Sequence, residues 1–171
     1  TVDFGDIKVE FIKTNHSIQD AAALAIFTPA GTIVHTGDFK VDYTPVFGDP
    51  IDLQRFAELG KDGVLAMMSD STNAEKPGST MSERTVGGTF ERIFAEHQQN
   101  RIIVATFASN VDRVQQIINT AAKYKRKVVV EGRSMVNVIT VASELHYIDI
   151  PEGTLISIDE LKSYPDEQTV L

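Results

Sequence analysis

Residues 14–40 read TNHSIQDAAALAIFTPAGTIVHTGDFK, and this stretch organises the first half of the chain. Two apolar runs, 22–28 and 32–35, flank a Pro-Ala-Gly turn, which predicts a β-hairpin. His16 precedes the first run and Asp38 follows the second, so the hairpin would return both side chains to one edge of a sheet. An imidazole facing a carboxylate there forms a mixed nitrogen and oxygen site that suits Zn²⁺ or Mn²⁺.

The composition bounds the class of protein. The chain has 171 residues, of which 42% are hydrophobic, enough to bury a core in one large or two small domains. No apolar run is long enough to cross a bilayer, so we expect no membrane partner. The absence of cysteine excludes disulfides and thiolate metal sites and fits a cytoplasmic location. Both ends resemble strands already under way, so we expect a piece of a longer protein.

The charge is unevenly distributed along the chain. The net charge is -8, yet residues 84–133 carry nine basic and four acidic side chains, while residues 1–78 carry six basic and twelve acidic ones. An acidic part that collects metal beside a basic part that holds phosphates is compatible with a nuclease. The cluster Lys123–Lys127 alone is better explained as a solvated helix end.

Periodicity predicts a change of architecture near the Pro-Gly pair at residues 77–78. The part before it is β-rich, with strands near 5–13, 22–28, 32–36 and 63–68, and a helix at 53–59 that Asp52 would cap. The part after it alternates helices with strands, with helices after Ser82, at 111–121 and at 135–145, and strands at 101–106 and 127–130. Such alternation predicts an α/β fold with a parallel sheet.

Two predicted strand-to-helix junctions carry polar residues that suit an anion. Ser109 and Asn110 follow one strand, Arg133 and Ser134 follow the next, and the two serines are the expected helix caps. Arg133 would bind a phosphate through two parallel hydrogen bonds, and Phe107, just before the first pair, would stack on a base. Either junction alone fits an ordinary capped turn. Two in tandem favour a phosphate or nucleotide site.

Asp70 is a further candidate, in the polar stretch Ser69-Asp70-Ser71-Thr72-Asn73 after an apolar strand. A carboxylate at the end of a strand can orient a histidine or a metal-bound water, and it can equally close an Asx turn. His35 lies within a predicted strand. His97 and His146 fall near helix C-termini, where positive charge is favourable, and none of the three is assigned to catalysis.

Five stretches together resemble the ribonuclease J family, bacterial metallo-β-lactamase nucleases that carry an inserted β-CASP domain. They occur in the expected order and span most of the chain: Phe11–Ser17, His35–Lys40, Ser69–Asn73, Ala105–Asn110 and Gly132–Asn137. The resemblance implies that residues 1–78 are part of a metallo-β-lactamase β-sandwich sheet, and that residues 79–171 are part of a parallel-sheet αβα β-CASP domain.

The resemblance also implies roles for individual residues. His16 and Asp38 match metal ligands, and Asp38 would bridge two divalent ions, Zn²⁺ in the first place and Mn²⁺ as the alternative. Asp70 matches an acidic residue that helps to hold the catalytic arrangement. The positions that match the RNA-binding part of the family are Phe107, Ser109, Asn110, Arg133 and Ser134.

The implied activity is that of a cytoplasmic, homo-oligomeric ribonuclease. It would act as a 5′ to 3′ exonuclease with a preference for a 5′ monophosphate and as an endonuclease, in maturation and decay of RNA, ribosomal RNA included. The family's His-x-His-x-Asp-His cluster should precede Thr1, and two later histidines should follow Leu171. A catalytic zinc site needs about three protein ligands, and this piece offers two, so we expect it to be inactive alone.

Two other functions remain open on the sequence. Residues 79–171 could form an RNA- or nucleotide-binding module without chemistry, although no Gly-x-Gly-x-x-Gly or Gly-x-x-x-x-Gly-Lys loop follows any strand. The chain could also belong to another hydrolase on the metallo-β-lactamase scaffold, acting on small esters or thioesters. The second α/β segment disfavours this alternative, because a small substrate needs no second domain to hold it.

Overall fold

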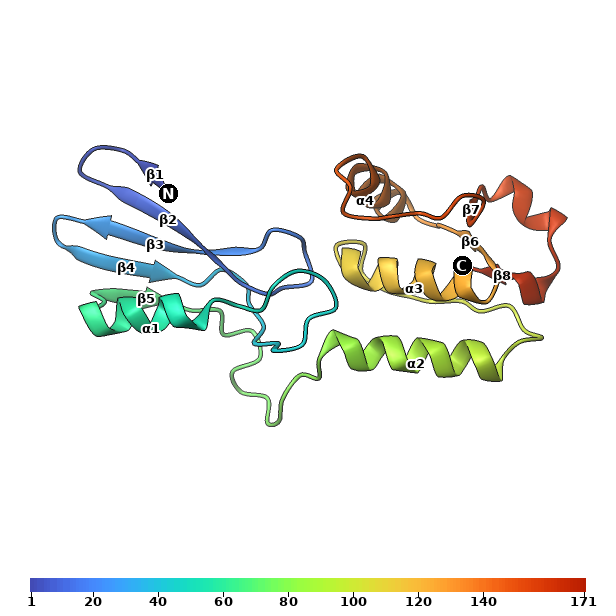
Figure 1. Cartoon of the computed structure of the whole chain (residues 1–171), viewed down its shortest axis with the longest axis horizontal. Helices are drawn as coiled ribbons and strands as arrows, with labels where there is room; N and C mark the ends of the chain where they lie inside the picture. Colours follow the sequence, from blue (N-terminus) through green and yellow to red (C-terminus); the bar gives the residue numbers. More distant parts are fainter. The chain divides into compact units, whose positions relative to one another are not determined.

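A computed structural model describes all residues from 1 to 171, and they form two compact units (Figure 1). The first unit contains Thr1–His16 and Asp20–Ser82, and the second contains Ser17–Gln19 and Glu83–Leu171. The units therefore divide between Ser82 and Glu83, four residues after the boundary predicted from the sequence. The assignment of 1–78 and 79–171 to two named domains stays a prediction. No helix has the length and apolar character to span a membrane.

The first unit is built on a five-stranded sheet in the order β1-β2-β3-β4-β5. Its strands are β1 (Val2–Asp3), β2 (Lys8–Lys13), β3 (Ala22–Thr28), β4 (Gly31–His35) and β5 (Ala66–Met68). The predicted hairpin is confirmed, because β3 and β4 pair antiparallel with Leu24 opposite His35 and Thr28 opposite Gly31. β5 runs parallel to β4, so the C-terminal ends of these two strands lie at the same end of the sheet.

Helix α1 (Leu53–Asp62) connects β4 to β5 and supplies part of the core of the first unit. Leu59 of α1 packs with four buried side chains from three neighbouring strands: Ile12, Ala23, Ala25 and Val34. The predicted cap is confirmed, since the Asp52 carboxylate accepts a hydrogen bond from the Arg55 amide at 2.9 Å. This packing holds the strands in place and so fixes where the loops at their ends begin.

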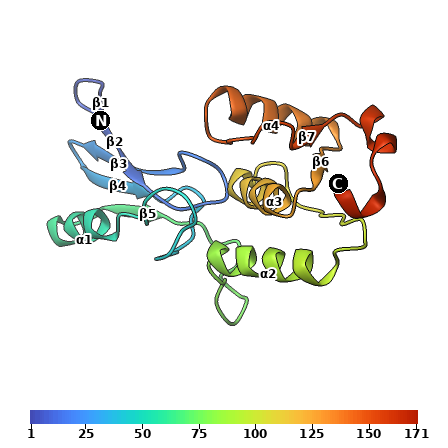
Figure 2. The same ribbon diagram turned by 45° about the vertical axis from the view of Figure 1, so that its right-hand side comes forward.

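The second unit combines helices (Figure 2) with a three-stranded parallel sheet in the order β7-β6-β8. Its elements are α2 (Glu83–Glu96), α3 (Val111–Lys123), β6 (Lys127–Val129), α4 (Arg133–Glu144), β7 (Leu155–Ile156), two short 3₁₀ turns (Asp159–Ser163 and Asp166–Gln168) and β8 (Thr169–Val170). The predicted α/β class and parallel sheet are confirmed. Helix α3 contributes to both hydrophobic clusters, one shared with α2 and the sheet and the other with α4.

The strand predicted at 101–106 is not a regular strand. Only Ile102 forms a bridge, parallel to Val170, and Val104 donates to the Leu171 carbonyl at 2.7 Å. The β-branched composition favours an extended chain, but a strand needs continuous pairing, and here only Ile102 and Val104 bond to the backbone of residues 169–171. The segment is therefore an extended connection along β8.

Candidate metal centre

His16 and Asp38 lie at the same end of the sheet in the first unit. His16 follows β2 and Asp38 follows β4, and both strands run antiparallel to β3 between them. A bridge between Asn15 and Lys40, with the Lys40 amide donating to the Asn15 carbonyl at 2.6 Å, joins the two loops. The Nε2 atom of His16 lies 3.8 Å from Oδ2 of Asp38, which is the close approach that the hairpin predicts. Their role as metal ligands stays a prediction.

The separation of these two atoms fits a shared cation. Bonds from a divalent metal to imidazole nitrogen and carboxylate oxygen are each about 2.0–2.2 Å, so two ligand atoms of one ion lie at most about 4.4 Å apart. The His16 and Asp38 side chains are 35% and 76% exposed, which leaves them accessible from solvent. No group of three or more histidine, cysteine or acidic side chains is arranged so that it could hold a metal ion on its own. The pair therefore fits part of a coordination sphere, to which other residues would have to contribute.

Asp70 follows β5, beside the end of β4. Its Oδ1 atom accepts hydrogen bonds from the Thr72 amide at 2.9 Å and the Thr72 hydroxyl at 2.7 Å. These two hydrogen bonds lower the pKa of Asp70. A hydrogen bond from the Phe39 amide and the electrostatic effect of His16 add smaller effects in the same direction. The bond to the Thr72 amide forms the Asx turn that the sequence also allows. The hydrogen bonds therefore favour the ionised carboxylate, which lies next to the loop that carries Asp38.

Thr36 connects these two loops, although the sequence did not identify it as part of the site. Thr36 is 4% exposed, and its hydroxyl oxygen accepts a hydrogen bond from the Asp70 amide at 3.0 Å. The same hydroxyl donates to the Gly37 carbonyl at 2.8 Å. A hydroxyl group between a predicted strand and a glycine turn was the available signal, but only the fold reveals that it is buried.

The second unit holds the residues predicted to contact RNA, in the loop before α3 and at the start of α4. Phe107 is 81% exposed, and Ser109 is exposed as well. Asn110 is buried, and its side-chain oxygen accepts from the Arg113 amide at 3.1 Å. The cap of α3 is therefore Asn110, and the prediction that Ser109 caps this helix is wrong. An Asn side chain serves equally well, and the helix starts one residue later than a Ser109 cap requires.

The prediction that Ser134 caps α4 is also wrong. The helix already includes Arg133 and Ser134, both exposed, and the capping position belongs to Gly132, which makes no side-chain bond. Gly132 has a φ of 91°, a left-handed conformation that glycine adopts readily, so the chain turns into the helix before Ser134. The roles of the five residues in RNA binding remain predictions.

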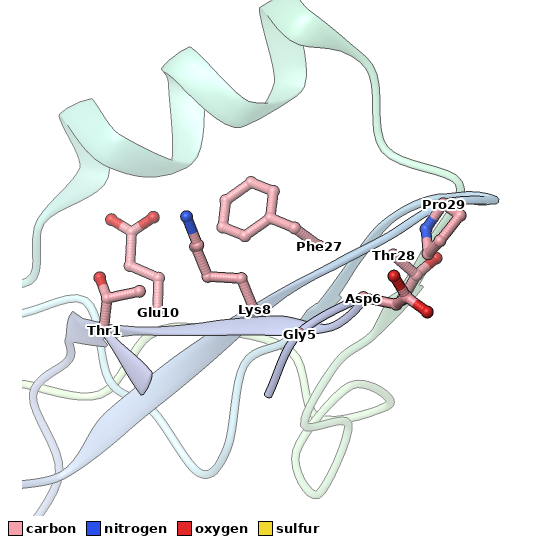
Figure 3. Close-up of a pocket in the computed structure, with 8 residues that line it drawn as sticks. All are labelled: Thr1, Gly5, Asp6, Lys8, Glu10, Phe27, Thr28 and Pro29. Atoms are coloured by element: carbon pink, nitrogen blue, oxygen red, sulfur yellow. The ribbon is translucent and has the colours of Figure 1, made fainter. Parts of the chain in front are cut away.

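A pocket of about 560 Å³ in the first unit lies away from these residues (Figure 3). It is lined by residues near the β1–β2 and β3–β4 turns: Thr1, Gly5, Asp6, Lys8, Glu10, Phe27, Thr28 and Pro29. Those turns are at the opposite end of the strands from the loops of His16 and Asp38. The chemistry of the side chains, and not the size of the hollow, therefore identifies the candidate site.

Comparison with known proteins gives consistent matches along the chain. The family model described as ribonuclease J, beta-CASP domain, matches residues 99–171. The chain is 46% identical over 170 residues to ribonuclease J of Helicobacter pylori, 48% over 163 residues to ribonuclease J of Synechocystis, and 41% over 170 residues to ribonuclease J2 of Bacillus subtilis. These alignments cover 99%, 95% and 99% of this chain. They confirm the resemblance inferred from the five stretches.

The chain spans about a quarter of the length of these curated relatives, namely 24%, 25% and 30%. A crystal structure of a protein of unknown function from Enterococcus faecalis superposes with a TM-score of 0.69 at 20% identity. That alignment covers 99% of this chain and 42% of the other. At this identity the superposition supports the fold alone.

Proposed function

We propose, since the chain belongs to the ribonuclease J family, that it is a segment of a metal-dependent ribonuclease and contributes part of its active site. The observation that carries this proposal is the 3.8 Å separation of His16 Nε2 and Asp38 Oδ2 at one end of the sheet. A ring nitrogen and a carboxylate in that arrangement suit a hard or borderline divalent cation. The whole protein would hydrolyse phosphodiester bonds in RNA.

Three side chains of this segment would have separate tasks. His16 and Asp38 would hold one face of a site for two divalent ions, Zn²⁺ in the first place and Mn²⁺ as the alternative. Such ions supply Lewis acidity to a scissile phosphate and lower the pKa of water. Asp70, whose carboxylate accepts two hydrogen bonds from Thr72, would orient a neighbouring group by accepting a hydrogen bond from it.

The second unit would hold the RNA strand. The exposed ring of Phe107 is available for stacking on a base, and the exposed guanidinium of Arg133 is available for a phosphate. An RNA affinity that survives chelation of metal and falls in Arg133→Ala would support this part. An unchanged affinity in Arg133→Ala would remove Arg133 from the RNA contacts.

The resemblance also supports a more specific proposal for the activity of the whole protein. The protein would act as a 5′ to 3′ exonuclease with a preference for a 5′ monophosphate, and as an endonuclease. It would function in the cytoplasm as a homo-oligomer, in maturation of ribosomal RNA and in RNA decay. The 171 residues alone would be inactive, because two ligands are too few for a catalytic site.

The experiment that tests the proposed function compares Asp38→Ala with Asp62→Ala in the full-length protein. Asp62 is exposed at the end of α1, so its substitution controls for the loss of one carboxylate. We expect Asp38→Ala to abolish metal-dependent RNA hydrolysis and Asp62→Ala to retain it. Near-normal hydrolysis by Asp38→Ala would exclude Asp38 from the site, and metal-dependent turnover by the isolated chain would contradict its predicted inactivity.

A further inference from the structure

The loop that presents Asp38 is fixed at Gly37 by the two side chains that precede it. The His35 Nδ1 atom accepts a hydrogen bond from the Gly37 amide at 3.0 Å, and the Thr36 hydroxyl donates to the Gly37 carbonyl at 2.8 Å. Gly37 has a φ of 59°, so the chain turns sharply between β4 and Asp38. Both polar backbone groups of this turn therefore have side-chain partners.

Thr36 also connects this turn to the loop of Asp70. Its amide donates to the Met68 carbonyl at 3.0 Å, which extends the β4–β5 pairing by one residue. Its hydroxyl oxygen accepts from the Asp70 amide at 3.0 Å. A hydroxyl has one proton and two lone pairs, so a single buried group can donate to one loop and accept from the other.

We propose that Thr36 is a positioning residue, whose buried hydroxyl sets the spacing between the Asp38 turn and the Asp70 loop. Side chains in direct contact with substrate or metal must be held closely in their productive geometry, and hydrogen bonds behind them provide that constraint. Valine has almost the same shape as threonine but neither donates nor accepts. Thr36→Val therefore removes both bonds while it preserves the packing. This inference rests on the proposed ribonuclease function.

Thr28 offers a matched control at the other end of the hairpin. Its hydroxyl donates to the Gly31 carbonyl at 2.8 Å and accepts from the Ala30 amide at 3.2 Å, the same pattern of bonds as at Thr36. Thr28→Val thus loses equivalent bonds far from His16 and Asp38 along the strands. Any effect that comes only from general destabilisation would appear in both valine variants.

The test uses the full-length protein with Thr36→Val, Thr36→Ser and Thr28→Val. In the metal-free protein we expect Thr36→Val to speed hydrogen exchange of the peptide containing the Asp70 amide by about tenfold, the effect of losing one hydrogen bond. With Mn²⁺ and RNA we expect kcat to fall about 10- to 100-fold with KM within about twofold. Thr36→Ser, which keeps the hydroxyl, should restore both values, and Thr28→Val should leave kcat unchanged.

Several outcomes would overturn the inference. These are unchanged exchange at Asp70 in Thr36→Val, an equal loss of kcat in Thr36→Val and Thr36→Ser, and an equal loss in Thr36→Val and Thr28→Val. If the unsubstituted protein fails to cleave RNA, the ribonuclease proposal fails together with any catalytic role of Thr36. The exchange measurement still decides separately whether the hydroxyl joins the two loops.

Discussion

Substitution of Gly37 by alanine should be costly, because a Cβ atom at this position meets two obstacles. The φ of 59° is left-handed, and the added Cβ would lie 3.0 Å from the Ala22 carbonyl oxygen. Gly48 provides the matched control, since it has a similar φ of 70° but no atom within 4 Å of an added Cβ. The comparison of Gly37→Ala with Gly48→Ala separates the conformational cost from the steric one.

The magnitudes follow from these two features. A left-handed conformation costs alanine about 1–2 kcal/mol, and the stiffer unfolded chain offsets about 0.4–1 kcal/mol of it. Gly48→Ala should therefore lower the free energy of unfolding by about 0.5–1 kcal/mol. At Gly37 the contact with a backbone oxygen adds an overpacking cost of about 1–3 kcal/mol, for a total of about 1.5–4 kcal/mol. Urea unfolding of the chain, followed by circular dichroism, measures both values.

The same substitution should also impair hydrolysis in the full-length protein. Relief of the contact with Ala22 would shift the Gly37 turn and with it Asp38, so RNA hydrolysis should fall in Gly37→Ala and stay near normal in Gly48→Ala. Equal destabilisation by the two substitutions would refute the steric part of the reasoning. Normal hydrolysis by Gly37→Ala would refute the link between this turn and the position of Asp38.

Two further predictions concern stability and pH. Arg126 is 4% exposed and donates to the carbonyls of His97 and Asn100, in the turn that follows α2, at 2.6 and 2.7 Å. Arg126→Met should therefore cost about 2–4 kcal/mol in urea unfolding. Lys125→Met, at the exposed neighbour, should change stability by less than about 0.5 kcal/mol, and a similar loss in both variants would exclude this role of Arg126. The pKa of Glu10 is lowered by the two bonds from Arg55, at 2.8 and 2.9 Å. Because the folded-state pKa lies below the unfolded value, the pair stabilises the fold above about pH 4.3 and loses this effect as the pH falls through the lowered pKa. Glu10→Gln should therefore destabilise at pH 7 but have little effect near about pH 2, and a penalty independent of pH would argue against the ion pair.

The sequence predicts those features of the fold that depend on local pattern. The Pro-Ala-Gly turn between two apolar runs specifies the β3–β4 hairpin, and the hairpin in turn brings His16 and Asp38 together. Alternating helices and strands likewise indicate the parallel sheet of the second unit. In each case residues close in sequence carry the information, and the antiparallel or crossover connection follows from general rules of chain topology.

The features that the sequence does not reveal depend on partners distant in sequence or on backbone angles. The segment from Arg101 to Thr106 has the composition of a strand but pairs only along β8, so it lacks regular strand structure. The start of α4 depends on the left-handed φ of Gly132. The hydrogen bond between Thr36 and Asp70 becomes visible only in the fold, where β5 brings Asp70 beside Thr36 from 34 residues away in the chain. Composition alone contains none of this information.

The most direct test of the shared-cation site is anomalous diffraction at the Mn²⁺ absorption edge from crystals of the full-length protein grown with Mn²⁺. We predict an anomalous peak within about 2.0–2.3 Å of both His16 Nε2 and a carboxylate oxygen of Asp38. A fully occupied Mn²⁺ site elsewhere, with both of these side chains left uncoordinated, would contradict the account.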